Sequence, residues 1–174
     1  MKEQSTINNT TNRLTTVLFI IYLITICWIL LFKLGVRFSY MGKRSVNLVP
    51  FNEPLILNGE NILNVLIFIP LGIYAGILFE RWIFGKKVLF CLLCSLLVEV
   101  LQYILRVGAF DVTDIITNTL GGLTGLILFM VIGKGFNNSV KAQKFINTIA
   151  ATGTIIMILL LVLLKMNMLP VRYQ

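Results

Sequence analysis

The chain has 174 residues, of which 57% are hydrophobic and only 13% are charged, and its mean hydropathy is +0.91. A soluble domain of this length cannot bury that much apolar surface, so the composition excludes the soluble classes and indicates a membrane protein. Fifteen Lys and Arg residues against seven Asp and Glu give a net charge of +8, but nucleic-acid binding needs a basic face on a soluble module and is excluded as well.

Five apolar windows divide the chain, and each is long enough to cross a bilayer. The windows hold 18 to 20 residues, and about 20 helical residues span a hydrocarbon core. We therefore expect an all-α, polytopic membrane protein, a single domain built as a bundle of about five transmembrane helices. The predicted helices cover residues 14–34, 61–79, 86–105, 114–133 and 145–164, with tails at 1–13 and 165–174.

The charges between the windows predict how the chain sits in the cell membrane. The short connections 80–87 and 134–144 carry three Lys or Arg residues each, whereas 106–113 carries one. Because Lys and Arg are enriched in cytoplasmic loops, we expect a cytoplasmic N-terminus and an outer C-terminus. The windows 14–32 and 145–164 contain no acid, base or Gln, which is typical of lipid-facing supports.

The connection 33–60 and the second helix place polar groups at the outer end. The connection carries Arg44 and Asn47, and Asn61 and Asn64 lie in the first turn of the helix that follows. The two helical asparagines have an alternative role, since amide side chains also join transmembrane helices by hydrogen bonds.

The third helix contains the costliest residue of the chain. At a rise of about 1.5 Å per residue, Glu99 lies about 9 Å from the outer end of this helix, and Gln102 shares its face at i+3. An ionisable residue inside a membrane usually marks a site or a paired partner. Arg44 and Arg106 are the expected partners, because guanidinium groups bind carboxylate or phosphate through two parallel hydrogen bonds.

The fourth helix continues the polar pattern. If it starts at or just before Asp111, then Asp111, Asp114 and Asn118 fall on one stripe at i, i+3 and i+7. Asp114 has a second interpretation as a helix N-cap. The Gly121-x-x-x-Gly125 spacing favours close helix packing. Because all these polar groups approach the outer leaflet, the sequence predicts a polar pocket that opens to the outer surface.

Three motifs in order, RSVNLVPF at 44–51, NILNVLIFIPLG at 61–72 and EVLQYILRVGAFDVTDIITNTLGG at 99–122, resemble the VanZ-like membrane proteins. The resemblance runs from about Trp28 to Phe129. It implies low-level resistance to the glycopeptide antibiotic teicoplanin in a Gram-positive cell membrane. It maps the polar motif positions of the family onto Arg44, Asn47, Asn61, Asn64, Glu99, Gln102, Asp111, Asp114 and Asn118.

Three function classes remain open on these residues. In the first, the pocket binds a lipid-linked cell-wall precursor or the acylated drug through the nine family positions and Arg106. In the second, Glu99, Asp111 and Asp114 are acid–base groups of an enzyme that acts on a lipid phosphate or a wall precursor, where carboxylates would also suit Mg²⁺ or Ca²⁺. In the third, the chain is a structural partner in a wall-synthesis complex. The chain has no histidine, and we predict neither a metal nor a cofactor.

Overall fold

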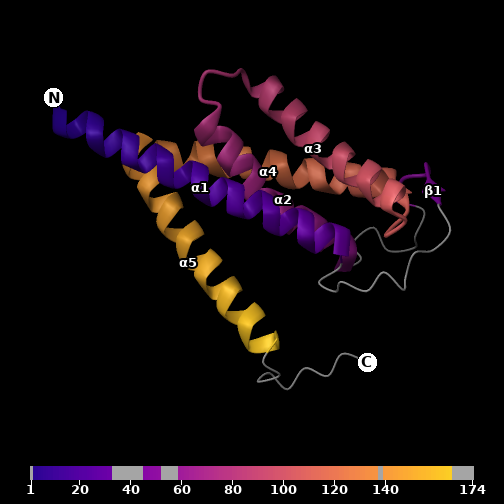
Figure 1. Ribbon diagram of the computed structural model, residues 1–174. Helices are drawn as coiled ribbons and strands as arrows, with labels where there is room; N and C mark the ends of the chain where they lie inside the picture. Colours follow the sequence, from indigo (N-terminus) through magenta and orange to yellow (C-terminus); the bar gives the residue numbers. More distant parts are fainter. Residues whose placement is uncertain (1, 33–44, 52–58, 137–138, 166–174) are drawn as a thin grey trace.

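The computed structural model is a bundle of long helices with a two-stranded sheet at one end (Figure 1). It describes the backbone of residues 2–32, 45–51, 59–136 and 139–165, and the side chains of residues 11–28, 45–51, 59–136 and 140–155. The elements are α1 (Lys2–Phe32), β1 (Val46–Asn47), α2 (Gly59–Leu78), α3 (Phe84–Leu105), β2 (Phe110–Asp111), α4 (Val112–Phe136) and α5 (Ser139–Lys165). The predicted all-α membrane fold is confirmed, and α1 and α5 begin earlier than the sequence predicts.

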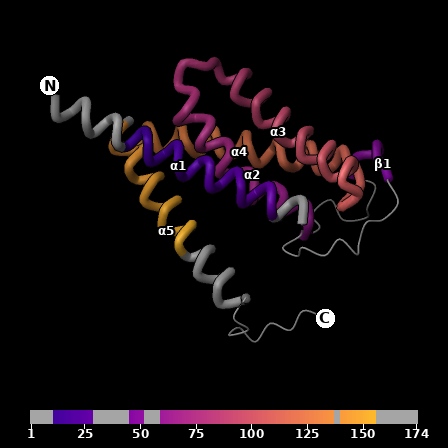
Figure 2. Tube along the Cα trace, viewed as in Figure 1, coloured from indigo at the N-terminus to yellow at the C-terminus, as the bar shows by residue number. Residues whose placement is uncertain are grey.

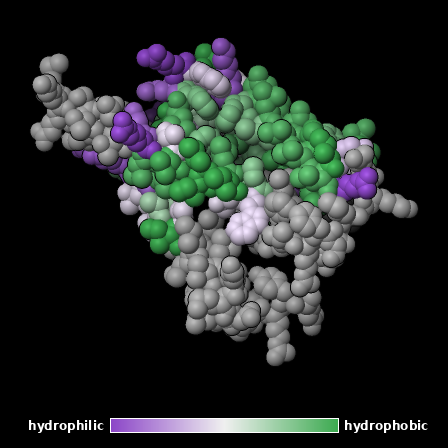
Figure 3. Space-filling view, viewed as in Figure 1, coloured by the Kyte–Doolittle hydropathy of each residue, from purple (hydrophilic) through white to green (hydrophobic). Residues whose placement is uncertain are grey.

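Most of the helices meet the requirements for crossing a membrane. Within the described side chains, four stretches are long and apolar enough: Thr11–Trp28, Gly59–Leu78, Phe84–Leu105 and Val112–Phe136. Large apolar side chains such as Ile24 and Leu97 are exposed on them, as lipid contact requires. Figure 3 shows this apolar surface over the middle of the molecule, between polar side chains near its ends. Since α5 has side chains described only to Ile155, the fifth span stays a prediction.

Glycines bring α2 and α4 into backbone contact. A Cβ atom added at Gly121 would overlap the carbonyl oxygen of Val65, and one added at Gly125 would overlap that of Ile69. The partner numbers rise together along the two helices, so α2 and α4 run parallel. Close approach of backbones is how helices gain packing energy where lipid offers no hydrophobic driving force.

The third helix packs on the same surface in the opposite direction. A Cβ at Gly122 would lie 2.7 Å from both Cβ and Sγ of Cys91 on α3. Cys91 is buried in the core with Phe68 and Leu71 of α2. This contact places α3 in register with α4 and leaves the three helices as the centre of the bundle.

A polar contact that the sequence did not predict joins α1 to α5. The Thr15 hydroxyl accepts hydrogen bonds from Asn147 Nδ2 at 2.9 Å and from Gln143 Nε2 at 2.8 Å. Thr15 and Asn147 are both buried. Figure 2 shows α5 running at an angle to the other helices, and an apolar cavity of about 350 Å³ lies between α5 and the bundle.

Candidate functional site

Two short strands connect the segment after α1 with the turn between α3 and α4. β1 and β2 pair in parallel, with Val46 opposite Phe110 and Asn47 opposite Asp111, and the Phe110 amide donates a hydrogen bond to the Ser45 carbonyl at 3.0 Å. The pairing brings Asn47 to the ends of the central helices, although it is 64 residues away from Asp111 in the chain.

Asp111 links β1 to the start of α4 through the two oxygens of its carboxylate. Its Oδ2 accepts a hydrogen bond from Asn47 Nδ2 at 2.9 Å, and its Oδ1 accepts one from the backbone N–H of Thr113 at 2.7 Å. The second bond pairs an amide at the start of α4, which begins at Val112 and has no intrahelical partner for its first N–H groups. The sequence allowed an N-cap at Asp114; the capping hydrogen bond shown by the structure is made by Asp111 instead.

Glu99 lies directly against Asp111. Its side chain is only 1% exposed, and its Oε2 accepts a hydrogen bond from the backbone N–H of Asp111 at 3.0 Å. Asp114, Asp111 and Glu60 all bring negative charge to bear on it. A carboxylate inside a bilayer costs on the order of 3 kcal/mol, so the fold holds Glu99 in place at a cost to stability.

The helix α2 contributes amide groups to the same region. Asn64 Nδ2 donates a hydrogen bond to Asp114 Oδ1 at 2.8 Å. Asn61 lies one turn earlier on α2 and is buried, as are Asn64 and Gln102. The Gln102 side chain packs against Gly108 in the turn that follows α3.

Two buried polar atoms lie deeper than the carboxylates. Asn118 Oδ1 and Ser95 Oγ have no hydrogen-bond partner among the described residues. Asn118 was among the predicted site residues, whereas Ser95 was not, because a lone serine in an apolar helix usually bonds to the carbonyl one turn before it. Its spacing of four residues from Glu99 is the signal that could have found it. The polar cluster, as used below, comprises Asn47, Asn61, Asn64, Ser95, Glu99, Gln102, Asp111, Asp114 and Asn118.

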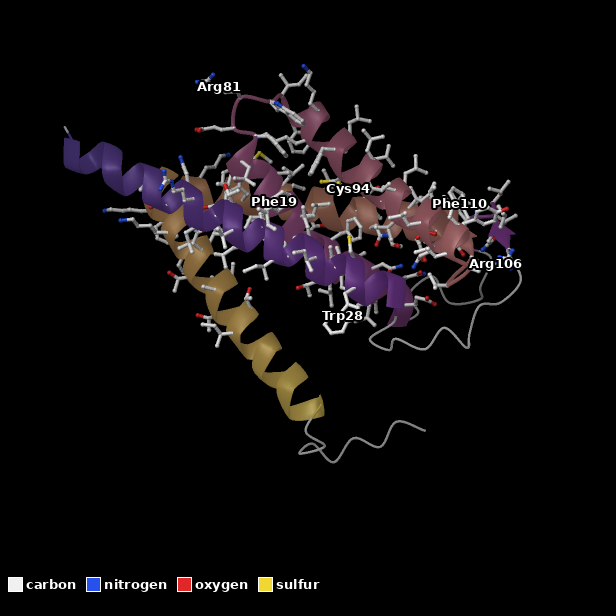
Figure 4. The ribbon with its side chains drawn as sticks, viewed as in Figure 1. Phe19, Trp28, Arg81, Cys94, Arg106 and Phe110 are labelled. Carbon is white, nitrogen blue, oxygen red and sulfur yellow. The ribbon has the colours of Figure 1, made fainter. Side chains whose placement is uncertain are left out.

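Of the two arginines predicted as partners of Glu99, Arg44 lies outside the described residues, and Arg106 is not part of this cluster. Arg106 follows α3 in a left-handed conformation, with φ of 59°, and its side chain is exposed. Figure 4 places Arg106 at the end of the molecule near β1, opposite the end that carries Arg81. Among the described residues, no ion pair links Arg106 to a carboxylate.

The carboxylates of the cluster are engaged by amides instead of by each other. In the described part of the chain, no three or more His, Cys, Asp and Glu side chains are grouped so that they could hold a metal ion. The arrangement offers fixed hydrogen-bond acceptors with concentrated negative charge, buried just inside one end of the bundle. Such a group of acceptors can orient a polar head group or serve in proton transfer.

Comparisons with known proteins assign the chain to a family. A family model described as VanZ/LLP1 matches residues 19–133, which include all of α2 and α3 and most of α4. The chain is 40% identical over 149 residues to Protein VanZ of Enterococcus faecium, an alignment that covers 83% of this chain and 89% of that protein. No solved structure matches. The chain belongs to the VanZ-like family, as the motifs around Glu99 and Asp111 predicted.

Proposed function

We propose that the polar cluster forms the outward-facing head-group site of an envelope-binding protein, which confers low-level resistance to teicoplanin in the cell membrane of a Gram-positive host. The observation that carries the proposal is the buried Glu99, linked by the Asp111 backbone and side chain to Asn47 in the segment before α2. A protein that only needed to span the membrane would gain stability by replacing this carboxylate with an apolar residue.

The ligand in this proposal is an amphiphile of the outer leaflet. It is a lipid-linked cell-wall precursor or the acylated drug, whose apolar part contacts the exposed helix surface while its polar part enters the cluster. Asn47 and Asn64 hold the two aspartates in fixed orientations. Arg106, which is exposed, would approach the ligand from the surface, and Arg44 is the second candidate, because guanidinium groups suit carboxylate or phosphate.

Resistance measurements with matched glutamate variants test the site. We expect Glu99→Ala to lose teicoplanin resistance while the protein still accumulates in membranes, as measured by growth inhibition and immunoblot. Glu80→Ala is the control, because Glu80 is exposed at the opposite end of the bundle, where it lines a cavity with Arg81. Asn64→Leu and Arg44→Ala should resemble Glu99→Ala. Full resistance in all three site variants would contradict the proposal.

The enzyme alternative rests on Glu99, Asp111 and Asp114, whose charges act on one another. Acid–base catalysis commonly uses paired carboxylates whose surroundings separate their protonation states. Purified protein with a radiolabelled lipid-linked precursor, with and without EDTA, separates the classes. Turnover would establish the enzyme, whereas saturable binding without product would establish the binding protein.

A further inference from the structure

The deepest part of the polar cluster contains two acceptors that no described residue pairs with. Asn118 is 1% exposed and Ser95 is fully buried, and neither Asn118 Oδ1 nor Ser95 Oγ has a partner among the described residues. An unpaired polar atom in such a place destabilises the folded state. An occupant that donates hydrogen bonds would remove that cost.

Helix register places these two atoms below Glu99. Gly122 on α4 packs against Cys91 on α3, and the two helices run in opposite directions. One turn outward from this contact is Asn118 on α4 and Ser95 on α3, and a further turn outward are Asp114 and Glu99. The four side chains therefore line one α3–α4 seam.

The same seam is closed by α2. Gly121, three residues after Asn118, contacts Val65 and Phe68. Asn64 of α2 reaches Asp114 on the same face of α4. Asn118 therefore points between α2 and α3, beneath the aspartate and Glu99.

The negative charge along the α3–α4 seam favours a positively charged ligand. Glu99 Oε2 accepts a hydrogen bond from the Asp111 amide, and a carboxylate can accept about four hydrogen bonds in all. Asp114, Asp111 and Glu60 add negative charge around it. A phosphate would be repelled by these groups, and a water molecule would satisfy the acceptors without balancing the charge.

We propose that the Ser95–Glu99–Asn118 floor of the cluster binds a primary ammonium group. The ammonium supplies one positive charge to Glu99 and three N–H donors, of which one pairs with Asn118 Oδ1 and one with Ser95 Oγ. This proposal rests on the head-group site proposed above and names its chemistry. The ammonium group belongs to an aminophospholipid head group or to a lysine-type side chain on a lipid-linked peptide.

Four ten-carbon probes separate charge from hydrogen bonding. The full chain is placed in phosphatidylcholine nanodiscs and titrated calorimetrically with decylammonium, decyltrimethylammonium, decanol and decyl phosphate, with empty nanodiscs as the blank. We expect saturable binding of decylammonium, and binding at least tenfold weaker for the trimethyl, alcohol and phosphate probes. Equal binding of decylammonium and decyl phosphate would overturn the proposal without any variant.

Variants assign the binding to the seam. Glu99→Gln and Asn118→Leu should each weaken decylammonium binding at least tenfold, and Ser95→Ala, which removes a single atom, should weaken it by a smaller factor. Glu80→Gln, at the opposite end, should bind as the wild type does. Helix content from circular dichroism shows whether each variant is folded. Unchanged binding by folded Glu99→Gln would mean that the carboxyl group is not the counter-charge and would refute the site.

Competition distinguishes the two sources of the ammonium. Displacement of decylammonium by phosphatidylethanolamine in the disc indicates a lipid head group, and displacement by a palmitoylated lysine peptide indicates a peptide. Displacement by neither would overturn the assignment to these classes. If site variants lose teicoplanin resistance but the wild type binds no decylammonium, the head-group site stands and only its ammonium chemistry fails. If the wild type binds decylammonium but those variants keep full resistance, the ammonium site stands and its role in resistance fails.

Discussion

Single hydrogen bonds around Asp111 connect parts of the chain that are distant in sequence. Its two carboxylate oxygens take separate donors, Asn47 Nδ2 and the Thr113 amide, and its own amide donates to Glu99. Bonds to a charged acceptor contribute roughly twice as much as neutral ones. The geometry at this one residue thus sets where the segment around β1, the start of α4 and Glu99 lie relative to one another.

Exchanging the amide of Asn47 and the carboxylate of Asp111 tests the hydrogen bond between them. Asp111→Asn keeps an acceptor for the Thr113 amide but turns an NH₂ group towards the NH₂ group of Asn47, so we expect about 1 kcal/mol less stability. Asn47→Asp alone faces one carboxylate with another and should also destabilise. The double variant restores a donor that faces an acceptor. Its loss of unfolding free energy in detergent should therefore be smaller than the sum of the two single losses. Additive effects would show that the Asn47–Asp111 bond is weak.

Residue chemistry in the sequence predicted much of the cluster. Depth and helical spacing indicated that Glu99, Gln102 and Asn118 would be buried, as they are. The role of Asp111 was not predictable in the same way, because a carboxylate next to a helix start can cap it, join a neighbouring strand or remain exposed. The identity of the neighbouring strand decides between these outcomes, and that is a property of the tertiary fold.

At the scale of elements, the glycines decide which helices touch. The contact between α2 and α4 is close enough that added Cβ atoms at Gly121 and Gly125 would overlap carbonyl oxygens. The sequence predicted close packing on this side of the fourth helix from Gly121-x-x-x-Gly125. It did not predict β1 and β2, because strands of two residues are too short to show an alternating pattern.

Two glycines of α4 give a matched test of this packing. Gly125→Ala places a methyl group onto the Ile69 carbonyl, whereas Gly133 has open space around its Cβ position. We expect Gly125→Ala to lower the free energy of unfolding by about 1–3 kcal/mol, as overpacking does. Gly133→Ala should be neutral or stabilising by up to about 1 kcal/mol, because alanine favours helices. The measurement is reversible unfolding in mixed detergent micelles; equal stabilities would contradict the close α2–α4 contact.

The α1–α5 contact is one that the sequence did not predict. Threonine hydroxyls in helices commonly bond to their own backbone, and Thr15 does bond to the Thr11 carbonyl at 2.9 Å. The same hydroxyl also meets Asn147 of α5. A threonine and an asparagine in apolar windows give no sign of pairing until the helices are placed side by side.

Among the described residues of the whole molecule, most of the basic side chains gather at one end and most of the carboxylates at the other. At the end near the α2–α3 turn, the described charged side chains are mostly basic, and Arg81 and Glu80 share a cavity there with Asn12 of α1 and Gln143 of α5. The described basic residues of that end are Arg13, Arg81, Lys86, Lys87, Lys134, Lys141 and Lys144. The other end carries Arg106 with the carboxylates of the polar cluster and Glu60. Figure 4 marks the two ends by the labelled Arg81 and Arg106.

This asymmetry predicts the orientation of the protein, because basic residues next to transmembrane helices are retained on the cytoplasmic side. A single cysteine in place of Ser45, beside β1, should react with a membrane-impermeant maleimide in intact cells, and a single cysteine in place of Lys86 should react only after permeabilisation. Both positions are exposed. The background replaces Cys27, Cys91 and Cys94 with alanine, so that labelling reports the new thiol alone.

The reverse labelling pattern would put the polar cluster at the cytoplasmic leaflet. The distances within the cluster would be unchanged, but a drug that acts outside the cell could no longer reach it, and teicoplanin would be removed as a direct ligand. Ser45→Cys therefore tests the access on which the proposed resistance depends, since the Ser45 carbonyl bonds to β2 next to Asp111. Labelling from outside would leave the cluster facing the leaflet where wall precursors and the antibiotic meet.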